Sequence, residues 1–325
     1  MDDFDRDVYC IGGLPFDAID MSKTISRLRD AKHAKKSCFL TTPNLNFLGL
    51  SQHDPDFRNS VLYSDIVIAD GAPIVWIAKL LGIPIRERVA GSSLFESLSK
   101  EWRRKLAVYF FGGPTGVAAE ASKHINEKST GLVCVGYYSP GFGTLDEMSD
   151  SSIIDNINAS NADFLKRAPV RLQKIGLEWA WRIKEEPHLW KRYWADGKFL
   201  LRFLTTKVLP LMLWLKFNQK RLKRLSPQSS VVLDTTGVHV KLVISGVLFD
   251  PVSQDTRTLL RASCIQNKNV MVDLTEAEYL SFGILGLLLL LKKQLDQQGF
   301  QMKIIGLGRS MSKLLDRNGL TFLTR

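Results

Sequence analysis

Short apolar runs alternate with helical patterns over residues 8–160, and this alternation limits the possible folds more than any other feature of the chain. The runs at 37–41, 65–69, 106–111 and 132–136 are expected to be buried strands. Helix-start signals come between them, for example Asp54 followed by proline and the capping-box pattern Ser93 to Glu96. Strands that alternate with helices predict a parallel sheet with helices on both faces.

The pattern of strands and helices starts again after residues 226–230, which are rich in serine. Strands are expected at 231–233, 238–244, 270–273 and 302–306, and helices at 283–298 and 310–318. Elements of this number and length make a compact α/β domain of ordinary size. The sequence therefore predicts three parts: residues 1–195, residues 196–228 as a basic segment and linker, and residues 229–325.

The positive charge of the chain is concentrated in residues 166–224. This stretch holds 16 Lys and Arg against 4 Asp and Glu, a net charge of +12, while the whole chain carries +11. It also contains five of the seven tryptophans. Cations interleaved with amphipathic aromatic rings suit the headgroup layer of an anionic membrane. The leucine-rich run 199–217 argues against nucleic acid, the other partner of basic patches.

The run 199–217 approaches the length that spans a bilayer, about 20 residues. Arg202, Lys207 and Pro210 interrupt it, so a helix in the membrane plane, broken near Pro210, is favoured over a span. A core helix at a domain interface is the remaining alternative. The expected membrane-docking residues are basic: Lys191, Arg192, Lys216, Lys220, Arg221, Lys223 and Arg224.

The remaining composition indicates a cytoplasmic protein without a metal centre. The four cysteines are scattered, and no histidine pair has the spacing of metal ligands. The first residues are acidic and lack an apolar core, so no signal peptide is expected. We expect a location at the inner face of the plasma membrane, and no cofactor.

Candidate ligand-binding residues follow the expected strands, because ligands of parallel α/β sheets bind beyond the carboxyl ends of the strands. Asp70 ends an all-apolar strand and precedes Gly71. A partly desolvated carboxylate there favours a raised pKa and a role as general base, although capping of the next helix is equally consistent. Thr42 and Asn44 offer a hydroxyl and an amide to a ligand. Their alternative is an ordinary strand-to-helix turn.

Further candidates follow later strands. Gly112 and Gly113 precede a helix, where backbone N–H groups can approach a phosphate, although the full dinucleotide or P-loop spacing is absent. Arg86 and Arg88 could neutralise a diphosphate or form surface ion pairs. Tyr137 lies in the segment that follows the strand at 132–136.

Several of these motifs together resemble the WecG/TagA/CpsF glycosyltransferases. The matching segments, in order, are 42–44, 69–73, 87–91, 111–116, 166–169, 176–179 and 186–193. The resemblance implies inverting transfer of an N-acetylhexosamine-type sugar from a UDP donor to a polyprenyl-diphosphate-linked acceptor, in polysaccharide synthesis. It implies a Rossmann-like domain with Asp70 as base, Thr42 and Asn44 as polar active-site contacts and Arg88 as a diphosphate contact. The basic, tryptophan-rich region resembles the membrane-docking appendage of that family.

The chain departs from the family pattern after Phe164. Family members continue there with a Gly-x-Pro-x-Gln-Glu motif, a helix and another strand, whereas here Phe164 and Leu165 run directly into Lys166. A crossover of this kind needs about 30 residues or more. The absent piece resembles part of the donor pocket, so a catalytically inactive, membrane-associated scaffold is the alternative function.

The C-terminal part resembles STAS domains, the anti-sigma-factor-antagonist type. The matching segments are 270–275, 281–292 and 304–307. The position that such domains usually phosphorylate is occupied by Phe282, which has no hydroxyl, and Ser281 is a poor substitute. The resemblance implies a protein partner, and a merely stabilising appendage is the alternative.

Overall fold

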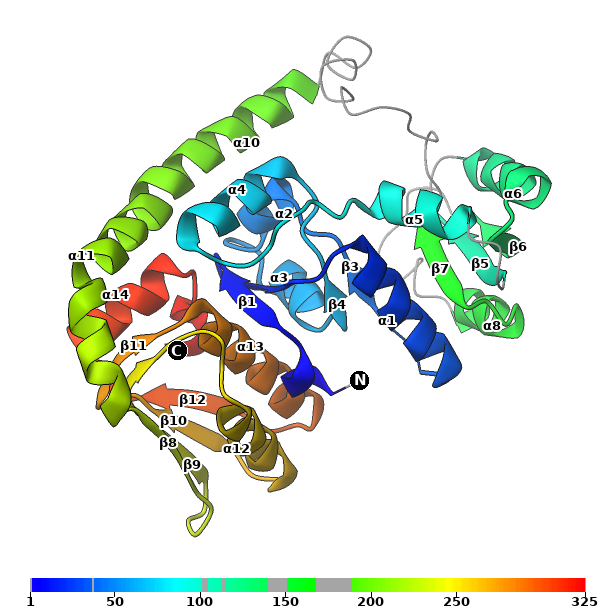
Figure 1. Ribbon diagram of the computed structural model, residues 1–325. Helices are drawn as coiled ribbons and strands as arrows, with labels where there is room; N and C mark the ends of the chain where they lie inside the picture. Colours follow the sequence, from blue (N-terminus) through cyan, green and yellow to red (C-terminus); the bar gives the residue numbers. More distant parts are fainter. Residues whose placement is uncertain are drawn as a thin grey trace. The chain divides into compact units, whose positions relative to one another are not determined.

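The computed structural model describes residues 2–36, 38–100, 105–112, 115–139, 151–167 and 189–324 (Figure 1). The chain forms two compact units. The first contains residues 1–31, 35–90 and 188–325, and the second contains residues 32–34 and 91–187. Residues 1–31 and 35–90 thus belong to the same unit as the C-terminal domain. The boundaries predicted at 195 and 228 remain a proposal.

The second unit is built on a parallel sheet in the order β6-β5-β7. Its strands are β5 (Leu106–Phe111), β6 (Leu132–Tyr138) and β7 (Phe164–Arg167), and its helices are α5 (Gly91–Ser99), α6 (Val117–Lys128) and α8 (Ser151–Ala159). The two strands predicted here are confirmed. The predicted capping box is wrong, because α5 begins at Gly91 and Ser93 lies inside the first turn.

The N-terminal part of the first unit contains two small sheets. Strands β1 (Val8–Ile11) and β2 (Leu14–Asp17) form an antiparallel hairpin, and β3 (Leu40–Thr41) pairs in parallel with β4 (Ile66–Val67). The helices are α1 (Met21–His33), α2 (Leu45–Leu50), α3 (Pro55–Leu62) and α4 (Ala72–Leu81). Both predicted strands are present, although shorter. The Asp54 cap is confirmed, since its Oδ1 accepts from the Phe57 N–H at 2.9 Å.

The C-terminal part has a mixed five-stranded sheet. Its path is β11-β9-β10-β12 with all neighbours parallel, and β8 pairs antiparallel with β9. The strands are β8 (Ser230–Asp234), β9 (Val240–Leu248), β10 (Val270–Asp273), β11 (Ala277–Leu280) and β12 (Met302–Ile305). The helices are α12 (Gln254–Ile265), α13 (Phe282–Gln297) and α14 (Arg309–Arg317). All elements predicted here are confirmed, and β11 and α12 are additional.

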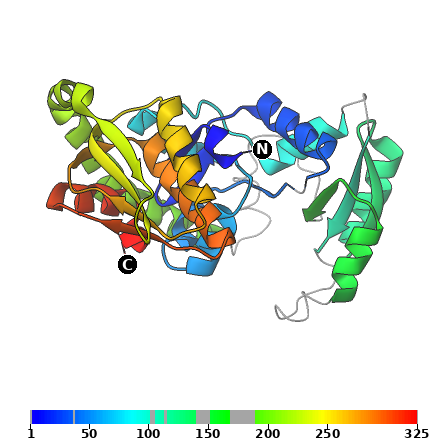
Figure 2. The ribbon, with the colours of Figure 1, turned by 90° about the horizontal axis from the view of Figure 1, so that it is seen from below.

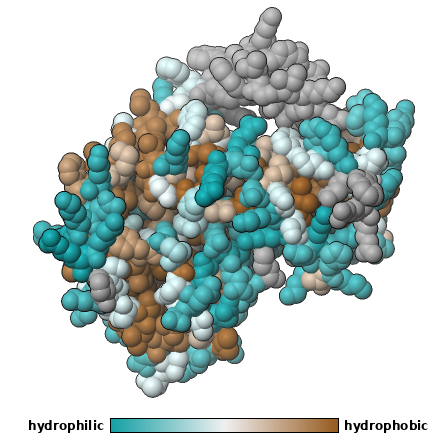
Figure 3. All heavy atoms as spheres, in the orientation of Figure 1, coloured by the Kyte–Doolittle hydropathy of each residue, from teal (hydrophilic) through white to brown (hydrophobic). Residues whose placement is uncertain are grey.

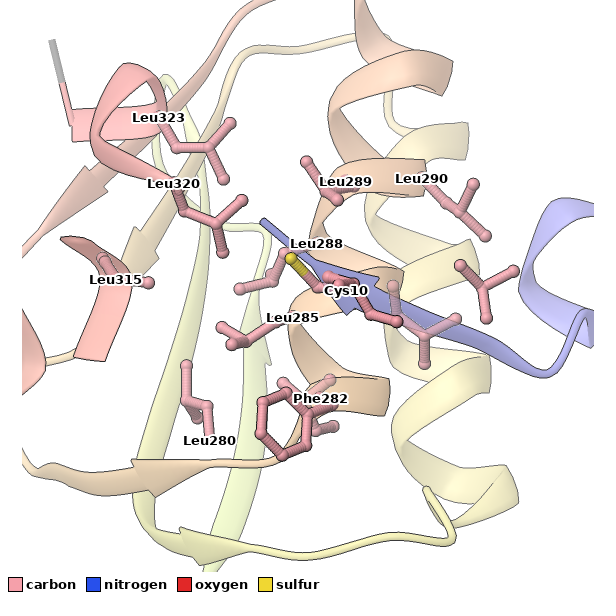
Figure 4. Close-up of a cluster of buried hydrophobic side chains, with 14 of the residues drawn as sticks. Cys10, Leu280, Phe282, Leu285, Leu288, Leu289, Leu290, Leu315, Leu320 and Leu323 are labelled. Atoms are coloured by element: carbon pink, nitrogen blue, oxygen red, sulfur yellow. The ribbon is translucent and has the colours of Figure 1, made fainter. Parts of the chain in front are cut away.

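Helix α13 is buried over almost its whole circumference. Every residue from Phe282 to Leu291 is buried, which is expected of a helix that is apolar on all faces. Part of this cover is the N-terminal hairpin: both views of the ribbon place β1 beside α13 (Figures 1 and 2). Cys10 of β1 points among the leucines of α13 and of the C-terminal segment (Figure 4). The hairpin and the C-terminal domain therefore share one hydrophobic core.

Gly286 marks the closest approach of α13 to the hairpin. A Cβ atom at this position would lie 2.5 Å from the Val8 carbonyl oxygen, which is backbone and cannot turn aside. We expect Gly286→Ala to lower the free energy of unfolding by about 2 kcal/mol, as for other overpacked cores. Gly197 of α10 (Leu189–Phe203) is the control, because in the described part of the chain nothing outside its own helix lies within 4 Å of an added Cβ. Gly197→Ala should stabilise by up to about 1 kcal/mol, and urea unfolding of both variants checks the contrast.

A buried ionic network joins the same two parts of the first unit. Arg6 contacts Asp3 and Asp17, each at 2.7 Å, and Lys293 of α13 contacts Asp3 at 3.0 Å and Asp65 at 3.3 Å. Burial opposes the charge of Arg6, but the Asp17 and Asp3 carboxylates raise its pKa above the ordinary value. Likewise the pKa of Asp3 is lowered, because Arg6 and Lys293 outweigh its desolvation. The network therefore keeps Arg6 and Asp3 charged, although both side chains are buried.

The basic, leucine-rich segment is helical along residues 189–225. Helix α10 leads into a π-helical turn at Leu204–Val208 (η2) and then into α11 (Leu209–Leu225). Pro210 has no N–H for the usual bond to the carbonyl four residues earlier, and Leu209 bonds instead to Leu204. The break predicted near Pro210 is thus a π turn within a continuing helix. Within the part of the chain that the structure describes, none of the helices combines the length and the hydropathy needed to cross a bilayer.

Candidate functional site

The carboxyl ends of β3 and β4 bring the predicted site residues together. The Asp70 N–H donates to the Pro43 carbonyl at 3.0 Å, which fixes the end of β4 against the segment that follows β3. Gly71 has a φ of +128° and lies beside Asn44. A Cβ atom added to Gly71 would be 3.7 Å from the Cβ of Asn44. The side chains of Thr42, Asn44 and Asp70 are all half-buried. The juxtaposition predicted from strand order is therefore present in the first unit.

Asn44 also has a local structural role. Its Oδ1 accepts from the N–H groups of Asn46 at 3.0 Å and Phe47 at 3.2 Å, so it is the N-cap of α2. This agrees with the turn alternative for the side-chain oxygen, and the Nδ2 group is not part of the cap. The N-cap position of α4 belongs to Gly71, one residue after Asp70.

The loop that carries Arg88 is fixed beside the same edge. The Val89 N–H donates to the Ala69 carbonyl at 2.9 Å, one residue before Asp70. The side chains of Arg86 and Arg88 are exposed in this loop. The backbone next to Arg88 is thus hydrogen-bonded to the segment that leads to Asp70.

Thr41 is a polar residue at this edge that the sequence did not single out. Its Oγ1 is buried and has no hydrogen-bond partner among the residues that the structure describes. Buried hydroxyls are nearly always paired, so an unpaired one invites a hydrogen bond from a bound molecule. The only signal in the sequence is its place immediately before Thr42.

The other predicted contacts belong to the second unit. The Gly112 N–H donates to the Tyr138 carbonyl at 2.8 Å, so in this structure it is engaged within the sheet region. Tyr137 is 51% exposed on β6. Gly113 lies outside the described residues. The first unit thus groups Thr42, Asn44, Asp70 and Arg88, and the second unit holds Gly112 and Tyr137.

The turn before α13 is closed by side-chain contacts. Ser281 is 2% exposed, its hydroxyl lies 2.9 Å from the Asp250 Oδ1, and it caps α13. Burial raises the pKa of Asp250, although the hydrogen bonds that its carboxylate accepts from the Ser281 hydroxyl and the Gly283 N–H act in the opposite direction. Phe282 is also buried. A modifying enzyme therefore finds neither a hydroxyl at 282 nor an accessible one at 281.

Five of the predicted membrane-docking residues are exposed on α11. They are Lys216, Lys220, Arg221, Lys223 and Arg224, of which Arg221 forms an ion pair with Glu278 at 3.0 Å. Lys191 and Arg192 lie on α10, and their side chains are outside the described residues. Large apolar side chains are exposed on α11 as well, with Phe217 at 81%. Figure 3 shows hydrophobic surface bordered by hydrophilic side chains on the face it presents.

The sequence profile of the Glycosyl transferase WecG/TagA/CpsF family matches residues 9–166 and 162–211. The chain belongs to this family. A STAS domain profile matches residues 219–324, so a STAS domain follows the transferase region. Helix α11 connects the two matches, since it spans Leu209–Leu225.

A curated relative gives the family match a chemical context. The N-acetylglucosaminyldiphosphoundecaprenol N-acetyl-beta-D-mannosaminyltransferase of Bacillus spizizenii is 24% identical over 209 residues, covering 52% of this chain and 79% of the relative. Because 52% of 325 residues is about 169, about 40 of the 209 aligned positions have no residue in this chain. The two WecG/TagA/CpsF segments also meet at residues 162–166, where the crossover was expected to be absent.

Proposed function

We propose that this WecG/TagA/CpsF-family chain transfers an N-acetylhexosamine-type sugar from a UDP donor to a polyprenyl-diphosphate-linked acceptor during cell-surface polysaccharide synthesis. The relative's name describes transfer of N-acetylmannosamine to a lipid-linked diphosphate sugar. One structural observation supports the proposal most: the Asp70 backbone is bonded to Pro43, between Thr42 and Asn44, at the ligand-binding edge of parallel strands.

In the proposed reaction Asp70 is the general base. Its carboxylate takes the proton of the acceptor hydroxyl while the oxygen attacks the anomeric carbon of the donor sugar. The bond from that carbon to the UDP oxygen breaks, and UDP leaves from the opposite face, which inverts the anomeric configuration. The Arg88 guanidinium would neutralise the diphosphate of the leaving group, and the Thr42 hydroxyl would orient a substrate hydroxyl.

Membrane docking belongs to the same proposal. The lipid-linked acceptor lies at a bilayer surface, and α11 exposes cations and large apolar side chains together. Amphipathic helices of this composition lie in the headgroup layer, where each basic residue contributes about 1 kcal/mol on an anionic membrane. We place the protein at the inner face of the plasma membrane on this basis.

The second candidate is a catalytically inactive scaffold that keeps the docking helix and the STAS domain. The gap of about 40 aligned positions favours it, because the absent segment resembles part of the donor pocket. The scaffold would act through the surface of the STAS domain and would not bind a nucleotide sugar.

UDP binding separates these two functions. In calorimetric titrations we expect the full chain to bind UDP with a Kd below 1 mM, which corresponds to about 4 kcal/mol. Arg88→Gln should weaken binding about tenfold, a loss of about 1.4 kcal/mol. Lys79→Gln is the control, since it removes the same charge at an exposed position in the last turn of α4. No heat of binding at millimolar UDP would favour the scaffold.

A further inference from the structure

A groove lies between α11 and α14 of the first unit, with a volume of about 300 Å³. Leu211 and Trp214 of α11 form one wall, and Leu314 of α14 contributes to the other. Leu211 and Leu314 belong to the buried core, so the floor of the groove is apolar. The groove lies outside the Asp70 site and has no part in the proposed reaction.

Three cations of α14 line this groove. Arg309, Lys313 and Arg317 are four residues apart, which places them along one face of the helix. Their side chains make no ion pair or hydrogen bond with any other residue that the structure describes. Like charges at this spacing destabilise a helix, and a bound anion would relieve the repulsion.

Neighbouring cations contrast with these three. Lys207 pairs with Asp316 at 2.8 Å, and Arg221 pairs with Glu278 at 3.0 Å. The lining residues of the groove include no carboxylate, and Ser310 is its sole neutral polar side chain. The positive charge of the three α14 cations therefore has no counter-charge among the residues that line the groove.

The apolar part of the surface identifies the class of anion. Leu209, Leu213 and Phe217 of α11 are exposed at 37%, 46% and 81%, on the same helix that forms one wall of the groove. The lining contains no amide or carboxylate side chain, the groups that usually bind the edge of a base or the hydroxyls of a ribose. An anion with a hydrocarbon tail satisfies both the cations and the apolar side chains.

We propose that the α11–α14 groove binds the phosphate headgroup of an anionic phospholipid, with its acyl chains along the exposed apolar side chains of α11. The inference rests on the membrane-docking part of the proposed function and extends it to the STAS domain, which would contribute Arg309, Lys313 and Arg317 to the membrane-facing surface. Docking would then be a property of the linker helix and the STAS domain together.

The test is a calorimetric titration of the full chain with dihexanoyl phosphatidylglycerol below its micelle concentration. Two variants lose the same charge: Arg309→Gln/Lys313→Gln/Arg317→Gln in the groove, and Lys23→Gln/Lys36→Gln/Lys303→Gln at exposed positions elsewhere in the first unit. We expect saturable binding that is weakened at least tenfold in the groove variant and less than twofold in the control variant. Dihexanoyl phosphatidylcholine and inorganic phosphate should each bind at least tenfold more weakly.

Three results would overturn the inference: no saturable binding, equal weakening in both variants, or binding of inorganic phosphate as tight as that of the lipid. The last result would indicate a simple anion site. Circular dichroism checks that both variants fold. If the triple groove variant does not fold, Lys313→Gln alone replaces it, since this substitution changes one exposed residue. The lipid titration contains no UDP or sugar donor, so a negative result does not affect the transferase proposal. The UDP titration tests that proposal separately.

Discussion

Asp17→Asn is expected to lower the free energy of unfolding by about 3–5 kcal/mol, the usual cost of removing one partner from a buried ion pair. The Asp17 side chain is fully buried and accepts from Arg6 at 2.7 Å and from Arg27 at 2.7 Å. Its Oδ2 also accepts from the Val67 N–H at 2.8 Å. Asparagine keeps the shape but leaves the buried Arg6 guanidinium without its strongest counter-charge. The substitution would therefore weaken the contact between the β1–β2 hairpin and β4.

Urea unfolding followed by tryptophan fluorescence measures this change. Glu127→Gln is the control, because Glu127 and Lys123 form an exposed pair at 4.0 Å. Such pairs contribute about 0.5 kcal/mol or less. If Asp17→Asn changed the unfolding midpoint no more than Glu127→Gln, the buried network would not stabilise the first unit.

Asp70→Asn is expected to reduce kcat/KM by about 10²–10⁴, the usual contribution of a general base. Asparagine preserves the size of the side chain and removes only its ability to take a proton. UDP binding should therefore stay within about twofold of the unchanged chain, since the base acts on the acceptor hydroxyl.

Asp56→Asn is the matched control for Asp70→Asn. Asp56 is exposed in the first turn of α3. The Asp56→Asn substitution should leave kcat/KM unchanged. An Asp70→Asn variant with full activity would remove Asp70 as the base, even if the chain proved to be a transferase.

The sequence predicted best those features that depend on local order along the chain. The strands at 106–111 and 132–136 are present in the structure, because a run of apolar residues between helix signals is sufficient to indicate a buried parallel strand. The contact between Asp70 and the segment after β3 was expected, because the carboxyl ends of parallel strands lie at the same edge of a sheet. These inferences needed no knowledge of distant contacts.

Contacts between distant segments could not be predicted in this way. The hairpin of β1 and β2 is buried on both faces, so its sequence shows no alternation of apolar and polar residues. The helix that covers it, α13, begins more than 260 residues later in the chain. Lys293 would be expected at the surface of a helix, yet it is buried since Asp3 and Asp65 come from other parts of the fold. The unpaired hydroxyl of Thr41 likewise depends on packing that the sequence does not show.

We infer that this chain transfers a sugar, although about 40 positions of its relative have no counterpart in it. The most direct measurement is the mass of the lipid product after the full chain is incubated with UDP-N-acetylmannosamine and a polyprenyl-diphosphate-linked N-acetylglucosamine. We expect a product heavier by one N-acetylhexosamine residue, formed together with UDP. An acceptor of unchanged mass after incubation with folded protein, also with other UDP-N-acetylhexosamines as donors, would contradict it.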